Sequence, residues 1–133
     1  MRRDLPIDQL MSFLERPNIA VLATFRPDGD VLLSPVWYEW RDGGFNVGSG
    51  EDDVKVRHLT RDPRAAIVVA EQTLPYAGVE VRGTARLVHE GAREIAQRIA
   101  GRYTDSSDSE DSVVIRLEPG ALRTWDFADD YGS

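Results

Sequence analysis

The alternation of apolar and polar residues along the chain predicts a series of strands joined by tight turns. Residues 19–25 form an apolar run suited to a buried strand, and residues 79–88 alternate as a half-buried strand does. Asp28-Gly29 and Asp42-Gly43 are strong hairpin turns. The same pattern predicts further strands over residues 31–40, 45–50, 65–70, 112–119 and 122–127.

Apolar residues at helical spacing predict short helices between these strands. The first begins near Ile7, repeats through Leu14 and ends before Pro17. A second helix over residues 52–61 has Asp52 or Asp53 near its start, and a third carries Ile95, Ala96, Ile99 and Tyr103.

Six or seven antiparallel strands at this spacing favour a mainly β fold, a small barrel in which few sheet edges stay exposed. Pro35 inside residues 31–40 predicts an edge strand or a bulge, and Gly83 predicts a bulge within residues 79–88. A chain of 133 residues suits one domain over residues 1–133. Its core is modest, so pairing with a second copy would add stability.

Composition and net charge exclude several classes of partner and of chemical site. A net charge of −7 argues against nucleic acid or an anionic membrane surface as partner. The absence of cysteine excludes disulfides, thiolate nucleophiles and Cys-based metal sites, and it fits a cytoplasmic location. No apolar run is long enough to span a bilayer, and no apolar segment of a signal peptide follows Met1.

Several kinds of catalytic site are also excluded. His58 and His89 are the only histidines, so we expect no His-rich metal site. Ser49 lies outside a nucleophile elbow, and Walker-type and Rossmann-type phosphate loops are absent. The acidic segment 105–111 lacks the glycine and spacing of an EF-hand, so we expect a solvated loop. We expect the same of Asp126, Asp129 and Asp130.

A basic cluster follows the strand at residues 45–50. Lys55 and Arg57 lie just after a Gly-Ser-Gly turn, where the N-terminus of a helix favours anions, so both could hold a phosphate. The alternative is a solvated helix of mixed charge in which Glu51 pairs with Lys55. The aromatic residues nearby leave a similar choice, because Trp37 alternates with Tyr38 and Trp40: one face would line the core, and the other could offer a flat wall to a planar ring.

Three segments in order resemble a known superfamily: "VLATFRPDGDVLLSPVWYEWRDGGFNVGSG", "KVRHLTRDPRAAIVV" and "PYAGVEVRGTARLV". They are similar to the pyridoxamine-5′-phosphate-oxidase-like split-barrel superfamily, and look closest to its branch of small F420-dependent oxidoreductases. The resemblance covers about residues 7–90 and is most specific in the stretch K-x-R-x-L-x-R-D-P-R. It implies a six-stranded split barrel and a homodimer with cofactors in grooves at the subunit interface.

The resemblance also implies roles for individual residues. Lys55 matches the family's phosphate-binding lysine, Arg57 the second basic residue of the motif, and Ser49 and Gly50 the strand end that faces the phosphate. Tyr76 would reach the cofactor or substrate from the neighbouring subunit. The strand that lines the cofactor ring corresponds to Ser34, Pro35, Val36 and Trp37.

Two positions depart from the family pattern. FMN-using oxidases place a Ser-Arg pair directly before the lysine, where this chain has Asp53-Val54, and F420-binding relatives often carry basic residues where this chain has Asp53 and Asp30. A carboxylate near a phosphate is repulsive. The pocket is therefore less cationic than usual, unless a residue such as Arg26 substitutes.

The implied activity is hydride transfer between reduced F420 and a small conjugated substrate, with a proton from Tyr38, Tyr76 or water. The alternatives are an FMN-binding oxidoreductase of the same fold, a carrier that holds a flavin or tetrapyrrole without turnover, and a structural dimer with a vestigial site. The sequence leaves the substrate open.

Overall fold

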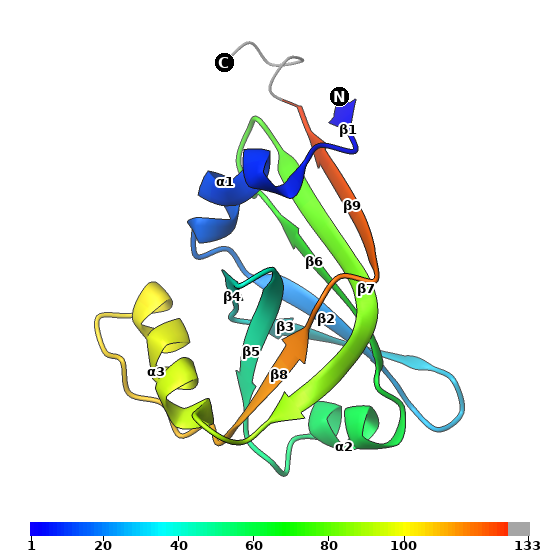
Figure 1. Ribbon diagram of the computed structural model, residues 1–133, viewed down its shortest axis with the longest axis vertical. Helices are drawn as coiled ribbons and strands as arrows, with labels where there is room; N and C mark the ends of the chain where they lie inside the picture. The colour runs from blue at the N-terminus through cyan, green and yellow to red at the C-terminus, as the bar shows by residue number, and fades with distance from the viewer. Residues whose placement is uncertain (128–133) are drawn as a thin grey trace.

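The computed structural model describes residues 1–127, whose strands form one curled antiparallel sheet (Figure 1). The strand order is β3-β2-β6-β7-β8-β5-β4, and β9 pairs with β7 and β1. The strands are β1 (Arg2–Arg3), β2 (Ala20–Phe25), β3 (Val31–Val36), β4 (Glu39–Arg41), β5 (Gly44–Ser49), β6 (Arg64–Ala70), β7 (Ala77–Val88), β8 (Val113–Leu117) and β9 (Ala121–Asp126).

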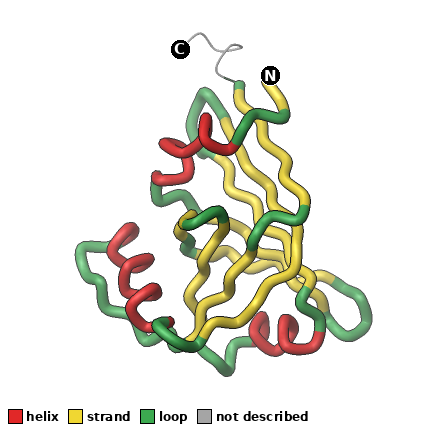
Figure 2. Tube along the Cα trace, viewed as in Figure 1, coloured by secondary structure: helices red, strands yellow, loops and turns green. Residues whose placement is uncertain are grey.

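Short helices pack around the outside of this curled sheet (Figure 2). They are the 3-10 helix η1 (Ile7–Leu10) and the α-helices α1 (Met11–Glu15), α2 (Val54–Arg61) and α3 (Ala92–Tyr103). Helix α2 packs on β2 and β7, whereas α3 packs on β5 and β8. The two longer helices therefore flank the end of β5, which lies between them in Figure 1.

The long strand β7 joins the two halves of the barrel. Its first half pairs with β6 and β9, and residues 85–88 pair with β8. Gly83 lies where the partner changes, and a Cβ there would stand 2.6 Å from the carbonyl oxygen of Glu118. The β6–β7 register runs through Gly83 without interruption, so the predicted bulge is wrong. Glycine is needed here for close backbone approach.

The predicted mainly β barrel is confirmed, with differences at its edges. Six strands of the expected barrel (β2, β3, β5, β6, β7 and β8) are joined in residues 1–127 by the short strands β1 and β4 and by β9, which was also predicted. Residues 31–40 are not one strand, because the chain leaves the sheet at Trp37 and Tyr38. Strand β3 ends the strand order, which confirms the edge position expected of Pro35.

The core lies inside the barrel and extends under η1 and α1. Leu14, Tyr38 and Phe45 are fully buried there. The hydroxyl of Tyr38 donates to the carbonyl oxygens of Leu14 at 3.1 Å and Arg16 at 3.2 Å. Tyr38 therefore anchors the N-terminal helices, and its burial leaves Tyr76 and water of the three proton sources considered. Within residues 1–127, no helix is long and apolar enough to cross a membrane.

One acidic residue near the C-terminus is not solvated as predicted. Asp126 is buried at the end of β9, and the Nε of Arg2 donates to its carboxylate at 2.9 Å. This ion pair joins β1 to β9. It could not be predicted from the sequence, because two arginines near the N-terminus form no pattern that indicates a strand or a partner. Asp129 and Asp130 lie outside the described residues.

We expect His58 to make the stability of the barrel depend on pH. Its ring is buried, with Nδ1 3.0 Å from the Thr24 hydroxyl. Burial lowers the pKa of His58, and the charges of Arg26, Arg61 and Arg57 lower it further. The unfolded chain thus binds the proton more readily, so stability present above about pH 6.5 is lost as pH falls, by at most about 1.4 kcal/mol per pH unit.

We expect His58→Gln to flatten this dependence between about pH 7 and pH 5.5, measured by urea unfolding. His89→Gln is the matched control, because the His89 side chain is 60% exposed. An unchanged slope in His58→Gln, or an equal flattening in His89→Gln, would contradict the assignment.

Candidate functional site

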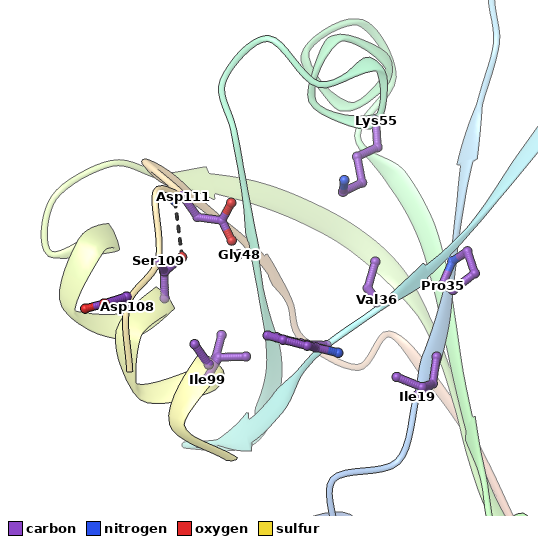
Figure 3. A pocket seen from close by; sticks show the side chains of 12 residues that line it. Ile19, Pro35, Val36, Gly48, Lys55, Ile99, Asp108, Ser109 and Asp111 are labelled. Carbon is purple, nitrogen blue, oxygen red and sulfur yellow. Dashed lines mark hydrogen bonds between the residues drawn. The ribbon is translucent and has the colours of Figure 1, made fainter. Parts of the chain in front are cut away.

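A cavity of about 410 Å³ opens between β3, the end of β5, the first turn of α2, and α3 with the loop that follows it (Figure 3). Its lining combines an apolar wall, one lysine and three polar residues of the loop before β8. The lining residues are Ile19, Pro35, Val36, Trp37, Gly48, Lys55, Ala96, Ile99, Ala100, Asp108, Ser109 and Asp111.

Lys55 reaches the cavity from the first turn of α2, and its side chain is only 12% exposed (Figure 3). Asp53 caps this helix by accepting the Lys55 backbone N–H at 3.3 Å, and its carboxylate lies 2.8 Å from the Lys55 ammonium. The hydrogen bond from Lys55 holds the pKa of Asp53 below its usual value. The predicted Glu51–Lys55 pair is wrong, since Glu51 lies 3.4 Å from His89.

The apolar wall is held flat by an aromatic stack. Trp37 lies parallel to Tyr103 of α3, with ring centroids 4.8 Å apart and an interplanar angle of 3°. The Tyr103 hydroxyl donates to the Asn18 carbonyl at 2.8 Å and accepts the Tyr38 N–H at 3.2 Å. These contacts fix the indole beside Pro35, as expected of a wall for a planar ring.

The loop between α3 and β8 forms the opposite side of the cavity, where Figure 3 shows Asp108, Ser109 and Asp111. A Cβ on Gly48 would lie 2.7 Å from the Asp111 carboxylate, so β5 and this loop approach closely because Gly48 has no side chain. The prediction of a solvated loop holds for Asp108, which is exposed, but is wrong for Asp111, which is partly buried against β5. Nothing in the local sequence marks this, because the packing of α3 places the loop.

An ionic network that is buried at Glu39 and exposed at Arg98 joins α3 to the barrel. Arg98 of α3 donates two hydrogen bonds, of 2.8 and 2.6 Å, to the buried carboxylate of Glu39, which also accepts the Asn46 side-chain amide at 2.7 Å. Arg116 then donates to the Asn46 side-chain oxygen at 3.2 Å. Burial alone would raise the pKa of Glu39, but the hydrogen bonds from Arg98 and Asn46 outweigh it and hold that pKa below its usual value.

The structure brings together some of the residues predicted for the site and not others. Pro35, Val36, Trp37 and Lys55 line one cavity. Ser49 is buried, and its hydroxyl donates to the Gly50 carbonyl at 3.1 Å. The residues Ser34, Ser49, Gly50, Arg57 and Tyr76 are not among those that line it.

Two of these outlying residues face solvent. Arg57 is exposed and donates to the Asp52 carbonyl at 3.2 Å. Tyr76 is 42% exposed and packs edge-to-face on Phe127. A role for either at a cofactor stays a prediction. The sequence also missed two residues: Tyr103 was assigned only to a helix, and Gly48 only to a strand. Within residues 1–127, no group of three or more His, Asp or Glu side chains could hold a metal ion.

Comparison with known proteins assigns the fold to a family. Residues 7–126 match the family described as pyridoxamine 5′-phosphate oxidase. The chain belongs to this family. The curled sheet is accordingly a split barrel of the pyridoxamine 5′-phosphate oxidase type, a superfamily of flavin- and F420-binding oxidoreductase-like proteins. The similarity expected from the three sequence segments is thereby confirmed, and it extends to β8 and β9.

Solved structures of similar fold support this assignment. A conserved hypothetical protein from Mycobacterium tuberculosis is 25% identical, with a TM-score of 0.81 over 92% of this chain and 86% of that chain. An F420 reductase is 29% identical, with a TM-score of 0.73 over 84% of this chain and 93% of that chain. An FAD-binding protein from Mesorhizobium loti is 20% identical, with a TM-score of 0.71 over 92% and 93%, and shows the shared fold alone.

Proposed function

We propose that the protein is an F420-dependent oxidoreductase that transfers a hydride between the reduced deazaflavin and a small conjugated substrate. The observation that carries the proposal is the cavity itself, where a stacked indole and a poorly exposed lysine line the same space. A cofactor made of a planar ring and an anionic tail needs a flat apolar surface for the ring and a cation for the tail in the same cavity.

The residues present fit such a cofactor. The ring would rest on the wall of Pro35, Val36 and Trp37, and the phosphate would meet Lys55 at the start of α2. F420 is favoured over FMN because one 29% identical structure is an F420 reductase, whereas Asp53 departs from the pattern of both groups. F420, when bound, supplies the hydride chemistry.

The chain itself would bind, orient and exclude water. Lys55 would exchange its pairing with Asp53 for the cofactor phosphate, and Asp53 would continue to cap α2. Ile19 and Ile99 extend the apolar wall, which would keep water from that side of the bound ring. With Tyr38 sealed in the core, the proton that completes a reduction would come from water or from Tyr76 of a second subunit.

A homodimer is the second part of the proposal. Val31, Leu33 and Pro35 point outward from edge strand β3, and Leu33 is 60% exposed. On the neighbouring strands their partners include Val21 and Ala23, so the outer face of β3 and β2 is apolar. Because Pro35 also lines the cavity, a partner on this face would border the cofactor.

We expect Leu33→Lys to weaken self-association at least about tenfold, since it places a charge in the centre of a buried apolar contact. Sedimentation velocity over a concentration series measures this. Leu122→Lys is the matched control, because Leu122 is 41% exposed on β9. A monomeric wild-type protein, or an equal effect of both variants, would contradict this interface.

A fluorescence titration of the wild-type protein with F420 and with FMN tests the proposed function. We expect saturable binding of F420, weaker binding of FMN, and oxidation of reduced F420 when a conjugated acceptor is added. Binding without turnover would indicate a carrier. Tighter FMN binding would indicate an FMN oxidoreductase, and binding of neither would indicate a vestigial site.

A further inference from the structure

The cavity offers a ligand one positive charge, and that charge is already paired. Lys55 is the only basic residue among those that line the cavity, and the Asp53 carboxylate lies 2.8 Å from its ammonium. The other ionisable residues of the lining, Asp108 and Asp111, are acidic. Once Lys55 holds the cofactor phosphate, the lining residues of the described chain supply no cation for the cofactor ring itself.

The ring would lie against apolar side chains instead. Pro35, Val36 and Trp37 form the wall, and Ile19 and Ile99 extend it. Reduction of a deazaflavin adds a hydride, so the reduced ring either carries one more negative charge than the oxidised ring or takes up a proton. An apolar surface without a cation disfavours the added charge, and charge near a redox cofactor is one of the means by which a protein tunes it. This surface therefore favours the oxidised ring.

The indole of Trp37 adds a preference in the same direction. The face of an aromatic ring is electron-rich, so it attracts an electron-poor ring more than an electron-rich one. The oxidised deazaflavin is flat and electron-poor, whereas reduction places a tetrahedral carbon in its central ring. Trp37 is 42% exposed in the cavity lining, and its ring lies parallel to that of Tyr103 with centroids 4.8 Å apart. Because the Tyr103 hydroxyl donates to the Asn18 carbonyl at 2.8 Å, the stack holds the indole in one orientation.

We propose that Trp37, held by Tyr103, and the lack of a second cation among the described lining residues make this cavity bind oxidised F420 more tightly than reduced F420. By linkage, the bound reduced cofactor is then a stronger hydride donor than the free one. The hydride, one hydrogen nucleus with two electrons, would pass to a carbon of the conjugated substrate, and the far atom of the conjugated system would take a proton from water. This preference concerns the site of the proposed function and rests on it. Trp37 would contact the ring, and Tyr103 is a positioning residue.

Calorimetric titration of the wild-type protein with oxidised F420, and with reduced F420 in the absence of oxygen, measures the preference. We expect the oxidised form to bind about tenfold more tightly, the scale of one aromatic pair, which corresponds to a potential about 30 mV lower for the bound cofactor. Equal dissociation constants, or tighter binding of the reduced form, would overturn the proposal.

Trp37→Leu should reduce the ratio of the two dissociation constants to about threefold or less, because leucine is apolar but has no aromatic face. Tyr103→Leu should lower the ratio as well, whereas Tyr103→Phe keeps the stacked ring and should keep most of the ratio. Trp125→Leu is the matched control, since it makes the same substitution on β9 at a residue that does not line this cavity. A merely structural role of Trp37 would weaken both forms equally and leave the ratio unchanged. That result, or an equal effect of Trp125→Leu on the ratio, contradicts the proposal.

Ile19→Lys tests the contribution of charge. Ile19 lines the cavity and is 46% exposed, so a lysine there adds a cation without burying it. We expect the reduced form to gain about threefold relative to the oxidised form, the scale of one exposed charge contact. An unchanged or larger preference for the oxidised form would overturn the part assigned to the missing cation.

The same titrations separate this preference from the proposed function. If both forms of F420 bind with equal affinity, the preference is wrong and the oxidoreductase proposal stands. If neither form binds, the proposed function fails, and the preference fails with it.

Discussion

Glu39→Ala should lower the free energy of unfolding by about 2 kcal/mol, because it leaves the buried Asn46 amide without an acceptor and removes the partner of Arg98, whose side chain is 39% exposed. The Glu39 side chain is only 5% exposed and accepts hydrogen bonds from Arg98 and Asn46. After truncation the buried Asn46 amide loses its acceptor, and α3 loses its link to β4. Chemical denaturation measures the change.

Two variants separate the buried charge from other effects. Glu39→Gln keeps the side-chain volume and an acceptor for Asn46, so it should cost about half as much. Glu80→Ala removes a carboxylate whose partners Arg82 and Arg123 have side chains 70% and 65% exposed, and it should cost less than about 1 kcal/mol. A loss in Glu39→Ala no larger than in Glu80→Ala would show that the network does not anchor α3.

Lys55→Met should weaken F420 binding by about 2 kcal/mol, or about thirtyfold, the scale of a charge-assisted hydrogen bond. Methionine keeps the apolar stem that packs at the cavity but removes the ammonium. The loss should exceed that of a lone hydrogen bond, since the Asp53 carboxylate 2.8 Å from the lysine would then face the phosphate without compensation. Fluorescence titration with F420 measures both dissociation constants.

Two further variants test whether the effect on F420 binding is specific to the Lys55 charge. Arg57→Met makes the same charge change on the same helix but outside the cavity lining, so we expect only about a threefold effect. Asp53→Asn should tighten F420 binding, because the asparagine can still cap α2 while Lys55 is released from its ion pair. An unchanged dissociation constant in Lys55→Met would refute the role of this residue.

The strands of the barrel could be predicted because their signals are local. The Asp-Gly turns, the apolar run of β2 and the alternation of β7 each specify an element without reference to the rest of the chain. The break at Trp37 and Tyr38 could not be predicted from alternation, because it depends on Tyr38 entering the core beneath α1. Gly83 illustrates the same limit: the sequence marks a special position, and only the packing shows that the Glu118 carbonyl requires it.

The candidate site divides in the same way. Lys55 and the β3 wall lie in two neighbouring segments of the family resemblance, so their proximity could be expected from that resemblance although β4 and β5 separate them in the chain. Tyr103, Asp108 and Asp111 come from a later segment, which reaches the cavity because α3 packs on β5 and β8 and is joined to Glu39 by Arg98. A contact between segments this far apart leaves no periodicity in the sequence, and the same loop read alone is a solvated acidic segment.

A crystal structure of the protein with F420 tests the central claim most directly. The account predicts the cofactor phosphate at about 3 Å from the Lys55 ammonium, with the deazaflavin ring against Pro35, Val36 and Trp37. A phosphate bound elsewhere, with Lys55 still paired to Asp53 and the Trp37 wall uncovered, would contradict it.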